Sequence, residues 1–524
     1  MTNYRIDFSK YKLRQYEKEL AVREFEHQFP NIEKKSVTDE AITFVSPVIL
    51  DECKLKKLTF YSEFHCKNGE YTKQYIPTDQ TLIENFQKYQ PNLFNGIRPN
   101  TSREIRYLTH SLHEYKGRFY PQLAKSLFNY AGLKQGDTVL DPFCGSGTTL
   151  LESLLFGINA TGIDINPVAF MIARAKIQSV LLNVEELSMI DDRLKEIKDK
   201  SGLNDVDTEQ LHHSLDIDYL KKWFPIINLN NIISIQSSIS NLPKNLQFLP
   251  KVVLSNLLRK FSYQDPNQLR IRRRSDTPPE NLIPIFQLEL QRQIENLLKF
   301  KSIKKFDLQA NVRNYLGDIR TLMQNDFIDE NSVDAVITSP PYATALPYVD
   351  TDRLSLFAFG YTDKEKFKQL EKSLIGNREI NKSERVLVDG ELEKNFESPQ
   401  LPVPVIDLLK KIYHLNKNAD VGFRRKNKAA LLYKYFMDMQ EGIQQVSKAL
   451  KKGKFAFFVV GNNQTKAGEE HIDIPTDDFI GLIAEHNNFK LVEKISMSVQ
   501  KGYMIHAKNA IHSESILVLQ NQII

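Results

Sequence analysis

The sequence predicts an α/β fold: a doubly wound, mostly parallel sheet with two large insertions and a small α+β module at the N-terminus. Two short apolar strands, DTVLDPF and INATGIDI, are each followed by a helical segment. The same rhythm returns at NVRNYLGDI and SVDAVITSPPY after a long interruption. A long helix, KAALLYKYFMDMQEGIQQVSKALKKG, and further strands close the chain. Strands that alternate with helices indicate a parallel sheet, so one α/β domain with two insertions explains the pattern.

The segment boundaries follow from where this rhythm stops and resumes. The stretch 177–310 is polar and mostly helical, and 363–427 is charged with poor periodicity. We therefore expect an N-terminal α+β module at 1–104, a core half at 105–176, a helical insertion at 177–310, a second core half at 311–362, a second insertion at 363–427 and the closing helix and strands at 428–524.

Composition is that of an ordinary globular protein, with 524 residues, 26% charged residues and a net charge of +5. There is no apolar run of the roughly 20 residues that span a bilayer, and the start, MTNYRIDFSKYKLRQYEKEL, lacks the apolar stretch of a signal peptide. A cytoplasmic location is therefore expected. Cys53, Cys66 and Cys144 form neither a disulfide framework nor a pair of zinc knuckles, so no metal is expected.

A glycine turn, VLDPFCGSGTT, places Gly145 and Gly147 between a strand and a helix. Glycines there permit positive φ and close approach of a ligand, and the helix N-terminus that follows favours an anion. No lysine follows the second glycine and a third glycine is absent, so this is neither a P-loop nor a dinucleotide fingerprint. Taken alone, the turn is either a ligand site or a plain tight turn.

Three acids follow three apolar strands. Asp141 and Asp164 end the first two strands, and Asp318 follows the third in LGDIR. Each acid alone is typical of a solvated residue that caps the end of a strand. Three such acids beside a glycine turn favour a single ligand that all three contact. Asp164 stands where doubly wound nucleotide folds place the ribose-binding acid. Asp318 is suited to an adenine amino group and Asp141 to an ammonium or hydroxyl, so the ligand has a ribose, an adenine and an amino-acid-like end.

The motif DPFCGSGTT followed by TSPPY resembles the amino-group DNA methyltransferases, which transfer a methyl group from S-adenosylmethionine to cytosine N4 or adenine N6. The resemblance covers 105–176, 311–362 and 428–520, including THSLHEYKGRFYPQLAKSL and the late helix and strand. It implies a Rossmann-like methyltransferase fold, with the cofactor half at 105–176 and the catalytic half at 311–362. The cofactor-binding residues it implies are Asp141, Phe143, Gly145, Gly147, Thr148, Asp164, Ile165 and Asp318.

The resemblance also assigns chemistry to the Ser-Pro-Pro-Tyr elbow. Acceptors aimed at an exocyclic amino group localise its lone pair, and the Ser339 hydroxyl and the Pro340 carbonyl are candidates. Pro340 and Pro341 stiffen the elbow, so the acceptors are in place before the base arrives. Tyr342 offers a face on which a flipped base can stack. Cys144 is assigned no chemistry.

Which amino group is methylated depends on the residue before Pro-Pro-Tyr. Serine is commoner in the cytosine-N4 enzymes of the family, so we expect N4-methylcytosine in duplex DNA, in restriction–modification or self-marking. A separate restriction endonuclease is a candidate partner. An adenine-N6 enzyme, an RNA methyltransferase and an inactive DNA-binding module are the alternatives.

Two basic clusters are candidate DNA contacts. NQLRIRRRS, in the helical insertion, is the expected target-recognition site, and GFRRKNK is a second candidate. After the elbow, YVDTDRLSLFAFGY predicts a helix lining the base pocket, in which Asp350, Asp352 and Arg353 form a structural ion pair. The DNA-contacting residues expected are Arg270, Arg272, Arg273, Arg274, Arg424 and Arg425, with Lys426 and Lys428 beside the last two.

Overall fold

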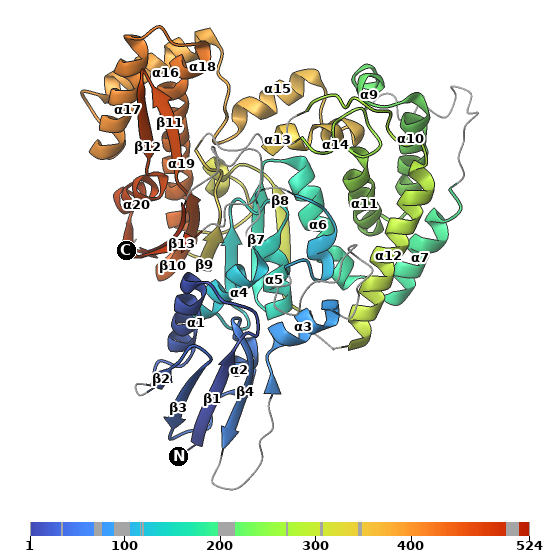
Figure 1. The fold of residues 1–524 in the computed structure, drawn as a ribbon, viewed down its shortest axis with the longest axis vertical. Helices are drawn as coiled ribbons and strands as arrows, with labels where there is room; N and C mark the ends of the chain where they lie inside the picture. The colour runs from blue at the N-terminus through green and yellow to red at the C-terminus, as the bar shows by residue number, and fades with distance from the viewer. Residues whose placement is uncertain are drawn as a thin grey trace.

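A seven-stranded sheet forms the centre of the molecule, in the order β13-β14-β10-β9-β6-β7-β8 (Figure 1). The pairs from β10 to β8 are parallel, and β14 is antiparallel to both of its neighbours. This confirms the predicted α/β fold with its mostly parallel sheet. The strands are β6 (Thr138–Asp141), β7 (Asn159–Asp164), β8 (Val312–Leu316), β9 (Val333–Thr338), β10 (Leu450–Gly461), β13 (Phe489–Ser498) and β14 (Ser513–Asn521).

The structure is a computed structural model. It describes residues 2–32, 35–67, 76–88, 105–115, 117, 120–197, 215–268, 271–303, 308–343, 348–498 and 513–522.

The topological switch point lies between β6 and β9. The chain runs outward from β6 through β7 to β8, then returns to pair β9 with β6 and continues to β10. In open α/β sheets a ligand crevice forms at such a point, outside the carboxyl ends of the strands. The glycine turn follows β6 and the Ser-Pro-Pro-Tyr elbow follows β9. Strand pairing therefore brings the two motifs to the same edge of the sheet.

Strand periodicity divides the core between the two faces of the sheet. Val139 and Ile337 pack with α1 (Gln15–Gln28) and α4 (Pro121–Tyr130) on one face. Leu140 and Val336 pack on the other face with α17 (Val403–Lys417), α19 (Lys428–Ala449) and α20 (Thr476–His486). All six residues of β9 are buried. Apolar runs in parallel strands arise because both faces are covered.

A helical layer packs beside the β7–β8 side of the sheet (Figure 1). The hydrophobic side chains of α5 (Thr148–Phe156) and α6 (Pro167–Leu181) share one core cluster with those of this layer. Ser255 in α11 is 2.7 Å, Oγ to Oγ, from Ser355 in α14, which ties the layer to the segment after the elbow. The other helices of the layer are α7 (Val184–Leu194), α9 (Ile217–Trp223), α10 (Ile226–Ser240), η4 (Lys244–Leu246), α11 (Phe248–Leu258) and α12 (Leu282–Ile303).

The charged stretch after the elbow is helical rather than irregular. Its regularity is hidden in the sequence because the helices bury few side chains: α16 buries only Leu392 and Asn395, and α15 only Phe367. A hairpin of β11 (Asn463–Ala467) and β12 (Glu470–Ile474) packs against α17, forming an upper lobe in Figure 1. The helices are α13 (Tyr348–Thr351), α14 (Arg353–Ala358), α15 (Lys364–Ser373), α16 (Lys382–Asn395) and α18 (Phe423–Lys426).

The N-terminal residues fold around an antiparallel sheet of order β2-β3-β1-β4-β5. β1 (Thr2–Phe8), at its centre, was missed in the sequence, although its residues alternate between buried and exposed positions. Helix α1 packs on α4, and Arg23 pairs with Glu493 in β13. The remaining elements are β2 (Lys35–Val37), β3 (Ala41–Ser46), α2 (Glu52–Lys57), β4 (Tyr61–Lys67), β5 (Ile76–Pro77) and α3 (Asp79–Lys88).

Within the described ranges no helix is both long and apolar enough to cross a membrane.

Candidate active site

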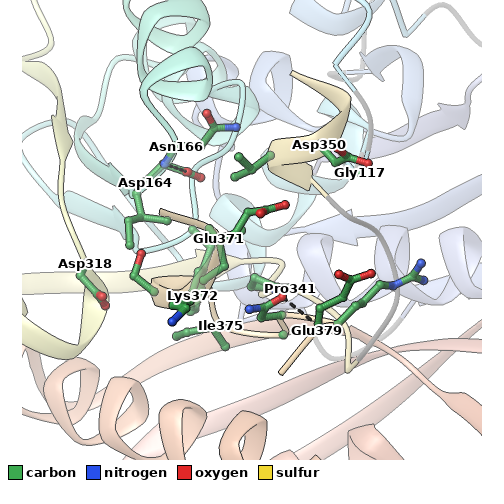
Figure 2. A pocket seen from close by; sticks show the side chains of 18 of the residues that line it. Gly117, Asp164, Asn166, Asp318, Pro341, Asp350, Glu371, Lys372, Ile375 and Glu379 are labelled. Atoms are coloured by element: carbon green, nitrogen blue, oxygen red, sulfur yellow. Dashed lines mark hydrogen bonds between the residues drawn. The ribbon is translucent and has the colours of Figure 1, made fainter. Parts of the chain in front are cut away.

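A cavity of about 580 Å³ opens at the carboxyl edge of the sheet, beside the switch point. Gly145, from the glycine turn, and Ser339 and Pro341, from the elbow, all line it. Figure 2 shows Asp164 and Asp318 along one part of its wall and Pro341 and Ile375 along another. The two motifs therefore share a single cavity, of a size typical for small-molecule sites.

The two glycines of the turn serve different contacts. Gly145 has φ of +48° and lines the cavity beneath Tyr115, whose ring would lie 3.3 Å from a Cβ at this position. Gly147 has φ of +76°, precedes the first turn of α5, and would place a Cβ 2.8 Å from Ala173 in α6. Gly147 is therefore needed for helix packing, while Gly145 keeps the backbone open to a ligand.

Asp164 stands at the end of β7 and lines the cavity. One carboxylate oxygen accepts from the Gly145 N–H at 2.9 Å and the other from the Asn166 N–H at 2.8 Å. Burial raises the pKa of Asp164 to about 6, although both hydrogen bonds lower it. Each oxygen keeps a second acceptor site, so the carboxylate is oriented and can still accept from a ligand hydroxyl.

Asp141 is turned away from the cavity. Its carboxylate accepts from the Thr149 hydroxyl at 2.6 Å, the Thr338 hydroxyl at 2.7 Å and the Phe143 N–H at 3.2 Å. Burial raises its pKa to about 6 as well. The side chain ties β6, α5 and β9 together beneath the turn. Like Gly147 and Thr148, Asp141 is not among the described residues that line the cavity, so its geometry differs from the ligand contact expected from the sequence.

Asp318 lines the cavity at the end of β8 and is held by Arg320. The Arg320 backbone N–H donates to Asp318 at 2.9 Å, and its guanidinium donates to the same carboxylate at 2.5 Å. That guanidinium also donates to Asp438 at 2.8 Å and to the Ser373 carbonyl at 2.6 Å. Arg320, which the sequence analysis did not single out, therefore links the strand end to α19 and to the end of α15.

Ser339 of the elbow lines the cavity and is hydrogen-bonded to the neighbouring strand. The Ser339 hydroxyl donates to the Val459 carbonyl in β10 at 3.1 Å. Because its proton is committed there, the oxygen presents acceptor sites only. The Tyr342 hydroxyl donates to Glu514 in β14 at 3.0 Å, and burial raises the pKa of that glutamic acid. Pro340 is buried, and neither it nor Tyr342 is among the described residues that line the cavity.

The loop between α15 and α16 covers the cavity, a contribution the sequence did not reveal. Leu374 and Ile375 add to the apolar wall that Phe143 and Ile165 also line. Gly376 has φ of +80°, and a Cβ there would lie 3.4 Å from the Tyr342 carbonyl oxygen. The loop thus packs directly on the elbow. No local pattern signals this contact, because the two segments meet only through tertiary structure.

Two other expectations have distinct outcomes. Arg353 pairs with Asp350 at 2.8 Å, as expected, and both line the cavity. Asp352 does not join that pair and instead accepts from the Asn166 side chain at 2.8 Å, because the β7–α6 turn lies against it. Burial raises the pKa of Asp352 to about 7.

None of the described cations of the two basic clusters lines the cavity. Arg272 is exposed, whereas the Arg273 guanidinium lies over the rings of Trp223 and Tyr263, with ring centroids at 5.6 and 5.3 Å. Arg274 pairs with Asp276 at 2.7 Å. Arg270 lies outside the described residues.

In the second cluster Arg424 is exposed, and Arg425 donates to the Gly468 carbonyl at 3.3 Å. Lys426 is exposed and Lys428 is half-buried. Phe423, just before these cations, does line the cavity. Among the described residues no group of three or more His, Cys, Asp or Glu side chains could hold a metal ion.

Comparison with known proteins finds a matching domain family and long matches to two Type II methyltransferases. Residues 111–207 match the RMKL-like methyltransferase domain family. The chain is 24% identical over 85% of its length to the Type II methyltransferase M.MvaI of Kocuria varians, covering 98% of that protein. It is 30% identical over 75% of its length to the Type II methyltransferase M.BsoBI of Geobacillus stearothermophilus, covering 81% of that protein.

Other similarities are shorter or weaker. A tRNA (guanine(10)-N2)-dimethyltransferase of Methanocaldococcus jannaschii is 29% identical over 34% of this chain and 42% of its own length. Among solved structures, TrmN from Thermus thermophilus aligns with 99% of this chain and 100% of its own, at 10% identity and a TM-score of 0.32.

Proposed function

Because this chain belongs to the amino-group DNA methyltransferases, which use S-adenosylmethionine, we propose that it methylates N4 of a specific cytosine in duplex DNA. Cytosine is chosen over adenine because serine before Pro-Pro-Tyr is commoner in the cytosine-N4 enzymes of the family. The observation that carries the amino-group chemistry is the hydrogen bond from Ser339 to the Val459 carbonyl. It makes the serine oxygen an acceptor for an amino hydrogen, within the cavity that Gly145 and Asp164 line.

The residues of the cavity fit the cofactor. S-adenosylmethionine supplies a methyl group activated by its sulfonium centre. Asp164 would accept from the ribose hydroxyls, since both of its oxygens are held by backbone N–H groups and keep acceptor sites. Asp318, fixed by Arg320, would accept from the adenine amino group. The apolar wall for the adenine ring comes from Phe143, Ile165, Ile319, Leu374 and Ile375.

Ser339 would act on the amino group that is methylated. An exocyclic amino nitrogen is a poor nucleophile because its lone pair is delocalised into the ring. Acceptance of its hydrogens by the Ser339 oxygen, which lines the cavity, would localise that lone pair on nitrogen. The Pro340 carbonyl is the second candidate acceptor, although Pro340 is buried and does not line the cavity. The elbow is rigid and bonded to β10, so these acceptors need no reorganisation when the base arrives. The proton released from nitrogen passes to solvent or to a nearby acceptor after transfer.

Tyr342 and the basic clusters are assigned to the DNA. The Tyr342 hydroxyl is held by Glu514, which would fix the ring for stacking on the flipped base. Exposed Arg272 and Arg424 are suited to phosphates. We further propose that the helical insertion at 177–310 carries target recognition, and that the protein acts in restriction–modification with a separate endonuclease.

Two alternatives have specific support. An adenine-N6 acceptor would use the same elbow, because the chemistry of Ser339 does not depend on the ring that carries the amino group. An RNA acceptor is supported by the similarity to a tRNA methyltransferase, which extends over 34% of this chain. The similarity to M.MvaI and M.BsoBI extends over 85% and 75% of this chain, which favours DNA.

One experiment separates these possibilities. Plasmid DNA and bulk tRNA are incubated with the full chain and S-adenosylmethionine, digested to nucleosides and analysed by mass spectrometry. We expect N4-methylcytosine from DNA alone; N6-methyladenine or a methylated ribonucleoside in its place would refute the proposal.

Ser339→Ala should lower kcat by about 100-fold, the scale of losing one oriented transition-state hydrogen bond, with cofactor affinity changed less than about threefold. Sequencing of the methylated DNA at single-base resolution then locates the target site.

A further inference from the structure

Phe423 is an exposed aromatic residue at the mouth of the catalytic cavity. Its side chain is 53% exposed, and no other phenylalanine whose exposure the structure describes is as exposed. It nevertheless lines the same cavity as Ser339 and Pro341. A single exposed apolar side chain needs no explanation by itself. Phe423 differs because its ring also lines the cavity, where an aromatic face is available to stack on a partner that covers the opening.

The position of Phe423 is held by the surrounding backbone. The Asn416 side chain donates to the Arg425 carbonyl at 2.9 Å, just after Phe423. The Asn427 side chain donates at 2.9 Å to the Ile380 carbonyl, in the loop that covers the cavity. Two buried amides therefore attach the segment to the helix before it and to the loop over the cavity, so the ring is presented from a fixed support.

The charge around Phe423 matches a nucleic acid. Arg424, Arg425 and Lys426 follow it directly, and Arg378 from the covering loop also lines the cavity. Cations flanking an aromatic ring form the combination used on DNA, where the charges meet phosphates and the ring meets bases. A hydrophobic protein partner would not require these four cations.

We propose that Phe423 is a wedge that stacks on the bases bordering the target nucleotide of duplex DNA lying over the cavity mouth. This inference rests on the proposed function, since it assumes a DNA duplex from which one nucleotide is extruded. Stacking by Phe423 would replace part of the base stacking that extrusion removes and so keep the vacated duplex open. Phe423 is thus a positioning residue: it acts on the duplex around the target and not on the reacting atoms.

The test compares two DNA duplexes that carry the methylation site located above. In one the target base is paired; in the other it faces an abasic site, so that extrusion needs no pairing to be broken. Phe423→Ala should lower kcat/KM about tenfold on the paired duplex, the scale of one base–aromatic stack, but less than about threefold on the abasic duplex. Phe423→Trp, which keeps an aromatic face, should retain activity on both.

Val403→Ala is the matched control. Val403 is an apolar residue of the same lobe, 58% exposed, and is not among the described residues that line the cavity. Its replacement should leave kcat/KM unchanged on both duplexes. Equal losses for Phe423→Ala on the two duplexes, or no loss on the paired one, would overturn the wedge. If the wild-type chain methylates neither duplex although it binds S-adenosylmethionine, the proposed function itself has failed, and the wedge fails with it.

Discussion

Asp141 and Asp164 show how two acids at neighbouring strand ends acquire different tasks. Burial raises the pKa of each to about 6. The Asp141 carboxylate accepts hydrogen bonds from two threonine hydroxyls and one backbone N–H beneath the glycine turn. Among the described residues, the Asp164 carboxylate accepts hydrogen bonds from two backbone N–H groups only, and it lines the cavity. The number and kind of partners, rather than position in the strand, separate the acid that ties the elements together from the acid that lines the cavity.

If Asp164 holds the ribose as proposed, its raised pKa should make the affinity for S-adenosylmethionine depend on pH. The carboxyl group is ionised above about pH 6 and protonated below it, and only the ionised form accepts ribose hydroxyls at both oxygens. The affinity for S-adenosylmethionine should therefore be constant from pH 7 to 8 and fall below pH 6, by at most about tenfold per pH unit. Asp164→Asn should weaken binding at pH 8 and remove most of this fall, as measured by calorimetry.

The exposed Asp329 supplies the control for this titration. Asp329→Asn alters an exposed acid outside the cavity and should leave the pH profile unchanged. A wild-type affinity that stays level down to pH 5 would contradict the role assigned to Asp164.

The covering loop between α15 and α16 is the element that completes the cavity. It contributes Leu374 and Ile375 to the wall and rests on the elbow through Gly376. Arg320 attaches it, because one guanidinium bonds Asp318, Asp438 and the Ser373 carbonyl together. A strand end, a long helix and the covering loop therefore share a single cation.

Arg320→Gln should shorten the residence time of the cofactor. Loss of the charged fork frees Asp318 and releases the loop at Ser373, and one charge-assisted hydrogen bond is worth enough to change a rate about tenfold. Stopped-flow measurement of S-adenosylmethionine release should show a faster dissociation rate by that order. Arg313→Gln, in the neighbouring strand β8, where the guanidinium bonds only the Asn311 side chain in the described structure, is the control. Equal release rates for wild type and Arg320→Gln would contradict this anchoring role.

Taken as a whole, the molecule places the helical layer and the upper lobe on different sides of the central sheet (Figure 1). The cavity at the carboxyl edge of that sheet is lined by Phe423 of the upper lobe and by no described residue of α7 to α12. The N-terminal sheet lies at the opposite end of the molecule from the upper lobe and is attached through α1 (Figure 1). There Glu24 is buried and accepts from the Thr59 N–H at 3.1 Å and from the Asn129 side chain at 2.9 Å. Burial raises the pKa of Glu24 to about 7. This contact joins the N-terminal residues to α4, on the face of the central sheet where Val139 and Ile337 pack.

The two basic clusters allow a test of how DNA lies on the whole molecule. Arg272 belongs to the helical layer and Arg424 to the upper lobe, and both are exposed. If both contact phosphates, each replacement by Gln should reduce the slope of log affinity against log salt by about 0.9, and the double replacement by about twice that. Fluorescence anisotropy of a labelled duplex at several salt concentrations measures the slopes.

Lys54→Gln is the control, because Lys54 is exposed on the N-terminal side in α2. An unchanged slope for Arg272→Gln would remove the helical layer from the interface, and an unchanged slope for Arg424→Gln would remove the upper lobe. Arg273 is unsuitable for this test, since its contacts with Trp223 and Tyr263 make its replacement a change in local packing.

The sequence by itself determined the sheet and both motifs at its edge. Apolar runs, helix caps and glycine or proline turns are local signals, and they located β6, β7, β8 and β9 together with Gly145 and Ser339. The same signals failed where burial is weak, as in α15 and α16, and at β1, whose partners come from later in the chain.

Tertiary structure alone decided which of these residues line the cavity. It turned Asp141 inward, placed Arg320 on Asp318, brought the loop after α15 over the elbow and set Phe423 at the cavity mouth. The physical reason is that these contacts join segments distant in sequence. Side-chain direction and competing partners settle such contacts, and neither is written in the local order of residues.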